Sequence, residues 1–154
     1  MAGRAIGAGL EMDVTALKLM AAGLMSWINI QADLPMPADP PDVQFLAHTE
    51  LEQDVCHQSC SVLGFSPHNG GSVIYLDAVL DVENNVCHRG ILLHELVHYM
   101  QRKSGRFTDK PPAVQSHMRE MEALRIQNAY LSQYGREIYI GTGVAATGLG
   151  YPNC

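Results

Sequence analysis

The chain has 154 residues, of which 47% are hydrophobic, and 16 acidic and 10 basic residues give it a formal net charge of −6. These values are typical of one globular domain, so we expect residues 1–154 to form a single domain. The acidic balance argues against a nucleic-acid partner, because such a partner requires a concentrated basic surface. The apolar stretch at 16–30 contains Lys18 and is too short to cross a bilayer, so we expect no membrane span.

Residues 1–41 are expected to form an N-terminal helix and a proline-rich linker. Asp13 or Thr15 is suited to cap the helix, and apolar residues then recur with a helical period until about residue 33. Four prolines between residues 35 and 42 predict an extended connection after this helix.

Residues 42–140 are expected to form the catalytic core, and 141–154 a glycine-rich tail. The sequence predicts short strands at 43–47, 72–76 and 137–140, and a short helix or turn within 50–60. Two longer helices are expected at about 89–102 and 113–133, separated by a loop that is rich in glycine and proline. The expected fold is therefore of the α+β class, with a small mixed sheet and two long helices.

Four cysteines permit two disulfides, and we expect the pairs Cys56–Cys60 and Cys87–Cys154. The second pair would fix the C-terminal tail to the rest of the chain. Disulfides favour a secreted or periplasmic protein, whereas the alternative is a cytoplasmic protein with four reduced thiols.

The helix expected at 89–102 carries the sequence His94-Glu95-Leu96-Val97-His98. Two histidines four residues apart lie on one helix face, so both rings can bind one zinc ion. Glu95 lies beside them and can act as the general base towards a metal-bound water. The rest of the helix is apolar nearly all round, and buried histidines there are unfavourable unless a metal or hydrogen bonds satisfy them. The alternative interpretation is a core helix whose histidines are only hydrogen-bonded.

A catalytic zinc site needs a third protein ligand. Position 104, where some zinc peptidases place a third histidine, is Ser104. The next helix offers Glu120 and Glu122, either of which can return to the metal from an antiparallel neighbour. The rotational phase of that helix is not fixed by the sequence, so both acids remain candidates.

These motifs resemble those of the gluzincins, zinc metallopeptidases with a zincin fold whose third ligand is a glutamate. The segment from Glu120 to Ala123 matches the Glu-x-x-Ala pattern of their second helix. The resemblance implies a zincin-like fold and Glu120 as the third ligand, with Glu122 as the alternative. Leu124 departs from the Asp or Asn that often follows, which leaves the residues that orient the histidines unidentified.

The resemblance also implies a peptide or protein substrate, hydrolysed by metal-activated water with Glu95 as general base. In zincins an edge strand precedes the active-site helix and pairs with the substrate, and residues 71–76 occupy that place. The alternatives are a zinc-binding module without catalysis and a zinc amidase that acts on a non-protein substrate.

Hydrolysis also needs a donor for the developing oxyanion. The sequence does not select among the candidates, which are Tyr130, Tyr134, Tyr139 and His117. The remaining histidines have no ligand spacing and are expected at the surface or in loops: His48, His57, His68 and His88.

Overall fold

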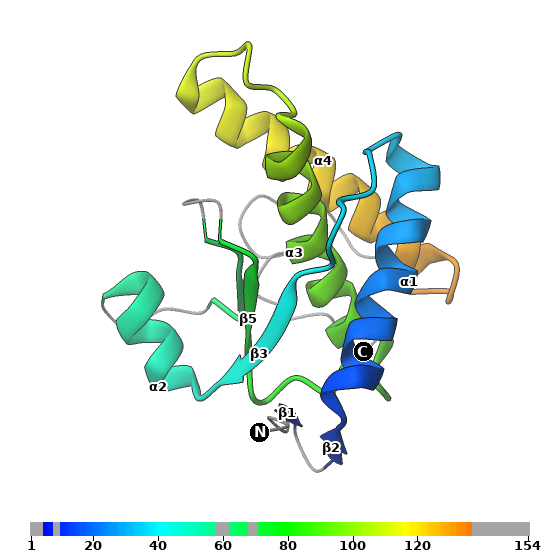
Figure 1. The fold of residues 1–154 in the computed structure, drawn as a ribbon, viewed down its shortest axis with the longest axis vertical. Helices are drawn as coiled ribbons and strands as arrows, with labels where there is room; N and C mark the ends of the chain where they lie inside the picture. Colours follow the sequence, from blue (N-terminus) through cyan, green and yellow to red (C-terminus); the bar gives the residue numbers. More distant parts are fainter. Residues whose placement is uncertain (1–4, 8–9, 58–61, 68–70, 137–154) are drawn as a thin grey trace.

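The computed structural model describes residues 5–7, 10–57, 62–67 and 71–136. Helix α3 (Val86–Ser104) runs through the middle of the molecule, between a small sheet and the helices α1 (Val14–Ala32) and α4 (Pro112–Ser132) (Figure 1). The sheet contains β3 (Asp42–Leu46), β4 (Gly64–Phe65) and β5 (Val73–Asp77). The α+β class and the small mixed sheet predicted from the sequence are therefore confirmed.

Helix α1 begins where its predicted cap lies. The Asp13 side chain accepts a hydrogen bond from the backbone N–H of Thr15 at 3.2 Å, which satisfies one of the donors that a helix N-terminus leaves open. The helix ends at Asp33, which adopts a left-handed conformation with φ 53°. Its buried face packs on α3, and Trp27 contacts Tyr130 of α4 with ring centroids 5.4 Å apart. A short antiparallel pair, β1 (Ala5–Gly7) and β2 (Leu10–Met12), precedes it.

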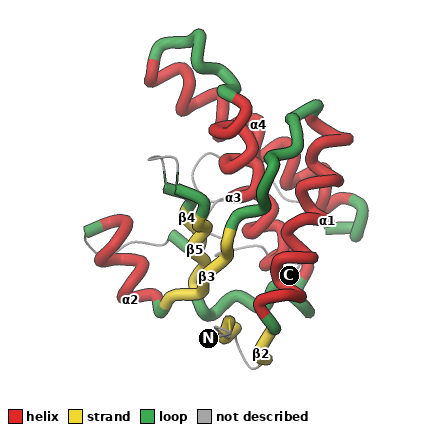
Figure 2. Tube along the Cα trace, viewed as in Figure 1, coloured by secondary structure: helices red, strands yellow, loops and turns green. Residues whose placement is uncertain are grey.

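The three-stranded sheet has the order β3-β5-β4. Figure 2 draws these three strands in yellow. Strand β3 pairs with β5 in parallel, and β4 pairs with β5 in antiparallel fashion. The prediction that residues 71–76 form the edge strand is therefore wrong, because β5 is the central strand. Its hydrogen bonds on both sides and its buried Ile74 and Leu76 make it the interior of the sheet. The strand at the edge next to α3 is β4. Its two residues are too few to show an alternating pattern in the sequence.

Residues 47–57 form a short helix, α2 (His48–Leu51), followed by a π-helical turn, η1 (Glu52–Cys56). The predicted short helix within 50–60 is thus confirmed, although it begins two residues earlier. The turn ends at His57, which has a φ of 56°.

Helix α3 begins three residues before its predicted start. The Asn85 side chain caps it by accepting hydrogen bonds from the backbone N–H groups of Cys87 and His88, at 2.9 and 3.1 Å. The helix ends at Gly105 with a φ of 69°, a conformation that favours glycine. Residues 90–101 are all buried except His98, which is half-buried, as the apolar sequence predicts.

Helices α3 and α4 pack antiparallel. Gly90 of α3 meets Leu131 near the end of α4, and Gln101 of α3 meets Arg119 nearer its start. A Cβ atom at position 90 would lie 3.1 Å from Leu131 Cδ1, so the absence of a side chain at Gly90 permits this close approach. The arrangement brings one face of α4 against the histidine-bearing face of α3.

Several predictions fall outside the described residues, namely the strand at 137–140 and the tail at 141–154. The side chains of Cys56, Cys60 and Cys154 also lie outside them, so both disulfide pairs remain predictions; Cys87 is buried at the start of α3. In the part of the chain that is described, no helix is both long and apolar enough to cross a membrane.

Candidate metal centre

Three side chains converge between α3 and α4. The Nε2 atoms of His94 and His98 lie 3.0 Å apart. Glu120 of α4 places Oε1 3.3 Å from His94 Nε2 and Oε2 3.1 Å from His98 Nε2. Residues from two helices, up to 26 positions apart in sequence, thus offer three ligand atoms within 4.8 Å of one another.

These separations fit a metal ion with tetrahedral coordination. Zinc binds nitrogen and oxygen at about 2.0–2.2 Å, so two of its ligand atoms are expected at about 3.3–3.5 Å from each other. The observed separations of 3.0–3.3 Å between the ligand atoms are close to this edge length. Two imidazoles and one carboxylate form a donor set of the kind found in catalytic zinc sites, whereas structural zinc sites have four protein ligands.

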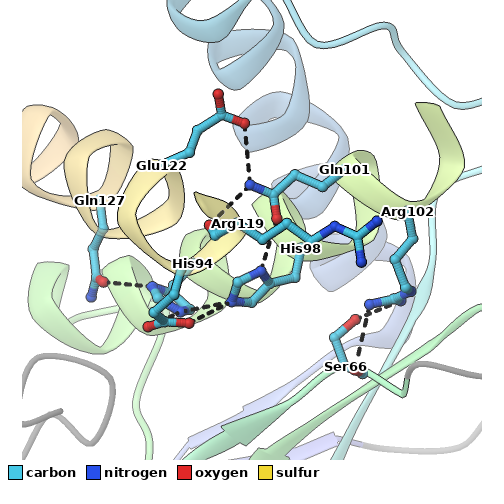
Figure 3. Close-up of polar contacts among 9 residues, drawn as sticks. Ser66, His94, His98, Gln101, Arg102, Arg119, Glu122 and Gln127 are labelled. Atoms are coloured by element: carbon cyan, nitrogen blue, oxygen red, sulfur yellow. Dashed lines mark hydrogen bonds and ion pairs between the residues drawn. The ribbon is translucent and has the colours of Figure 1, made fainter. Parts of the chain in front are cut away.

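Two glutamines orient the rings of the histidines. Gln127 Oε1 lies 3.0 Å from His94 Nδ1, and Gln101 Oε1 lies 2.9 Å from His98 Nδ1 (Figure 3). An amide oxygen only accepts hydrogen bonds, so both Nδ1 atoms donate. A neutral ring then presents the lone pair of Nε2 to a metal ion, whereas a ring that also carries a proton on Nε2 donates it to Glu120. Such outer partners fix the ring orientation of metal-binding histidines. The two glutamines thus take the orienting role that the resemblance assigns to an Asp or Asn, where this chain has Leu124.

Glu122 lies outside this cluster and contacts Gln101 and Arg106. Its Oε1 accepts a hydrogen bond from Gln101 Nε2 at 3.1 Å, and its Oε2 pairs with Arg106 Nη2 at 2.7 Å. Gln101 Nε2 also donates to the backbone oxygen of Arg119 at 3.0 Å. The amide orientation of Gln101 is therefore fixed by two acceptors. Glu120 is the acid that faces the histidines, whereas the alternative, Glu122, holds the glutamine that orients His98.

A proton or a cation stabilises this cluster. Burial opposes the ionisation of Glu120, but hydrogen bonds from His94 and His98 hold its pKa well below the ordinary value. Burial also opposes the charging of His98, yet the hydrogen bond to Glu120 and the charge of Glu95 raise the pKa of His98. Two imidazole lone pairs and a carboxylate at such short range repel one another unless a proton or a metal ion lies among them.

Glu95 lies beside the cluster without joining it. Its side chain is buried and lines the same cavity, of about 580 Å³, as His94, His98 and Glu120. Gly64 of β4 lies directly against it, since a Cβ atom at position 64 would be 3.0 Å from Glu95 Cγ and 3.2 Å from Glu95 Oε1. The edge of the sheet thus leaves room for this carboxyl group and limits where it can lie.

The described oxyanion candidates do not line the cavity. Tyr130 is buried against Trp27, Tyr134 is exposed beside Tyr130, and His117 is exposed on α4. Tyr139 lies outside the described residues. The polar donors that do line the cavity include Arg102 and Arg119.

None of the other described histidines joins the cluster. His48 lies between Asp77 and Glu52, with ring nitrogens 2.6 and 2.7 Å from their carboxylates. His88 accepts a hydrogen bond from the backbone N–H of Asp81 at 2.9 Å, and burial lowers its pKa. His57 is exposed, and His68 lies outside the described residues. His48 and His88 were expected at the surface or in loops, and both take part in local hydrogen bonds or ion pairs.

Sequence reasoning missed Gln101, Gln127, Gly64 and Arg102. A signal existed for both glutamines: Gln101 follows His98 by three residues, and Gln127 follows Glu120 by seven, so each shares a helix face with a predicted ligand. Gly64 and Arg102 gave no such signal, because their place depends on how the sheet packs against α3.

Comparison with known proteins identifies the family without assigning an activity. No curated protein and no solved structure matches the chain. Residues 14–141, which are most of the chain, match the family described as domain of unknown function DUF6647, and the protein therefore belongs to this family.

Proposed function

We propose that the protein is a zinc-dependent peptidase with a zincin-like arrangement of the gluzincin type. The observation that carries the proposal is the convergence of His94, His98 and Glu120 within 3.0–3.3 Å, beside a buried Glu95 in an open cavity. A purely structural zinc site has four protein ligands and no use for an adjacent buried acid.

His94, His98 and Glu120 would hold the ion, and Gln127 and Gln101 would keep the two rings aimed at it. When bound, zinc would supply Lewis acidity, which makes water more acidic and polarises a carbonyl group. Glu95 accepts the proton of the attacking water and delivers it to the leaving amine. Glu95 is only 7% exposed, so its carboxyl group lies within the site and not in bulk solvent.

The substrate class rests on the resemblance to gluzincins and on the cavity. A volume of about 580 Å³ lies in the range of sites that enclose a small ligand or a few residues of a peptide. Its wall combines apolar side chains from Val55, Val62 and Phe65 with the polar groups near the histidines. This combination suits a peptide side chain next to the bond to be cleaved.

The test begins with zinc. Elemental analysis of the purified protein is expected to find one zinc ion per chain, and Glu120→Gln is expected to lose it. Glu122→Gln is the matched control, two residues away on the same helix. It keeps the three ligands and is expected to retain the ion, with affinity lowered by about 10- to 100-fold at most. A wild-type protein that binds no zinc would contradict the proposal.

The second part of the test concerns catalysis. Glu95→Gln is expected to keep its zinc while peptide cleavage, followed by mass spectrometry on a peptide mixture, falls by about 10²- to 10⁴-fold. A wild type that holds zinc and cleaves no peptide would favour the alternatives, a binding module or an amidase for non-protein substrates. Equal cleavage by wild type and Glu95→Gln would remove Glu95 from the mechanism.

A further inference from the structure

Two arginines line the cavity that contains the metal cluster. Arg102 comes from the last turn of α3 and Arg119 from α4, one residue before Glu120. In Figure 3 the side chain of Arg119 extends from α4 towards that of Arg102, on one side of His98. The protein as a whole carries a formal charge of −6. Two positive groups in one cavity are therefore opposite in sign to the net charge of the chain.

Neither guanidinium is paired with a carboxylate among the described residues. Arg102 donates to the oxygen atoms of Ser66, with Nη2 2.7 Å from Oγ and Nη1 3.4 Å from the backbone oxygen. Arg119 donates from Nε and Nη2 to the backbone oxygen of Arg106, at 3.2 and 3.1 Å. Arg106 differs from both, since it forms an ion pair with Glu122 at 2.7 Å. The neutral partners position the two cavity arginines and leave their charge without a bonded counterion.

The geometry also leaves donors available. A guanidinium has five N–H donors, and the contacts above use two from each arginine. Burial and the neighbouring charge of Arg119 lower the pKa of Arg102, while Glu95 acts in the opposite direction without bonding to it. Two guanidinium groups that line one cavity and act on each other through their charges are more stable when an anion lies between them.

We propose that Arg102 and Arg119 form a subsite that binds a carboxylate group of the substrate next to the bond that is cleaved. Guanidinium groups bind carboxylates through paired, charge-assisted hydrogen bonds. The subsite rests on the proposed peptidase function for its role in catalysis, whereas carboxylate binding itself does not. The carboxylate belongs either to the C-terminus of a peptide or to an aspartate or glutamate side chain, and the two sources are distinguished by experiment.

Binding is measured with the Glu95→Gln protein, so that cleavage does not consume the probe. Calorimetry compares three probes: acetyl-trialanine with a free carboxylate, the same peptide as its C-terminal amide, and acetyl-Ala-Asp-Ala amide. We expect one or both acidic peptides to bind about 10- to 100-fold more tightly than the neutral amide, the usual range for hydrogen bonds to charged groups. Preference for the free C-terminus indicates cleavage at peptide ends, and preference for the Asp peptide indicates cleavage beside an acidic residue.

Substitutions then identify the residues responsible. Adding Arg102→Gln or Arg119→Gln is expected to abolish the preference for the acidic probe. Arg125→Gln is the matched control, because Arg125 is exposed on the same helix as Arg119, and its loss changes the net charge equally. If Arg119→Gln fails to fold, Arg119→Lys replaces it and is expected to lower the preference by less, since lysine keeps the charge without the paired donors.

The outcomes separate this proposal from the peptidase function. Equal binding of all three probes would overturn the subsite, as would a preference that survives both glutamine substitutions. If the acidic probe binds preferentially and the wild type cleaves no peptide, the subsite stands and the proposed function fails. If the wild type cleaves peptides and all probes bind equally, the function stands and the subsite fails.

Discussion

Glu95 and Gly64 lie against each other where α3 meets β4, and their contact limits the position of the proposed general base. The Cβ atom of any larger residue at position 64 would be 3.0 Å from Glu95 Cγ. Such a distance is shorter than an ordinary van der Waals contact, so either the strand or the carboxyl group would have to move. The small residue in β4 therefore has a consequence for chemistry on a neighbouring helix.

Gly64→Ala is expected to displace the Glu95 carboxylate and to lower kcat by about 10²-fold, because small misplacements of a reacting group have large effects on rate. Zinc affinity should not change, since the ligands and their glutamines lie elsewhere. Peptide cleavage and zinc titration on the same preparation provide the measurement.

Gly23→Ala is the control for this substitution, because a Cβ atom at Gly23 meets nothing within 4 Å. It should leave both activity and zinc affinity as they are. If Gly64→Ala cleaves peptides as fast as wild type, the observed position of Glu95 is not the one that it occupies during catalysis.

At the scale of the elements, α3 and α4 together carry all three residues of the candidate metal site, His94, His98 and Glu120. The close approach of Gly90 to Leu131 lies one turn before His94 and one turn after Gln127. Separation of the helices at this point would move Gln127 and Glu120 away from the histidines. Packing between the helices and geometry of the cluster are thus linked.

Gly90→Val is expected to lower the free energy of unfolding by about 1–3 kcal/mol, because the added methyl groups overlap with Leu131. It should also weaken zinc binding through the displacement of α4. Urea denaturation and zinc titration check the two effects. Gly23→Val makes the same substitution at an exposed helical position, and a loss of similar size there would show that helix propensity, not packing, is responsible.

The helices were predictable and the sheet was less so. The apolar periodicity and caps of α1, α3 and α4 are properties of local sequence, and they gave the elements with ends displaced by up to three residues. The central position of β5 was not predictable, because strand order depends on contacts with β3 and β4 from distant parts of the chain. The choice between Glu120 and Glu122 required the rotational phase of α4, which only its packing on α3 fixes.

At the scale of the whole molecule, one hydrophobic core joins α1, the sheet, α3 and α4. The metal cluster lies at the border between this core and the cavity, with His94 3% exposed and Glu120 42% exposed at their side chains. An ion bound there joins two helices that the core also joins. Binding of the ion is therefore expected to stabilise the fold as a whole.

Removal of zinc by a chelator is expected to lower the melting temperature. Free zinc at one hundred times its dissociation constant stabilises a folded protein by about 2.7 kcal/mol, which corresponds to a shift of about 5–10 °C for a domain of this size. Differential scanning fluorimetry with and without EDTA checks this. Glu95→Gln should show the same shift as wild type and Glu120→Gln none; a shift that persists in Glu120→Gln would place the ion elsewhere.

The two glutamines that hold the histidines are not held equally well themselves. The Gln101 amide is fixed by Glu122 and by the backbone of Arg119, whereas Gln127 Nε2 is buried without a hydrogen-bond partner among the described atoms. Rotation of the Gln127 amide by 180° would turn a donor towards His94 and reverse its tautomer. We expect the zinc-free protein at alkaline pH to hold His98 in one tautomer and His94 in an equilibrium of two, which zinc then reduces to one. Ring ¹⁵N chemical shifts distinguish these states. Identical shifts for both histidines before zinc is added would contradict the expected difference between His94 and His98.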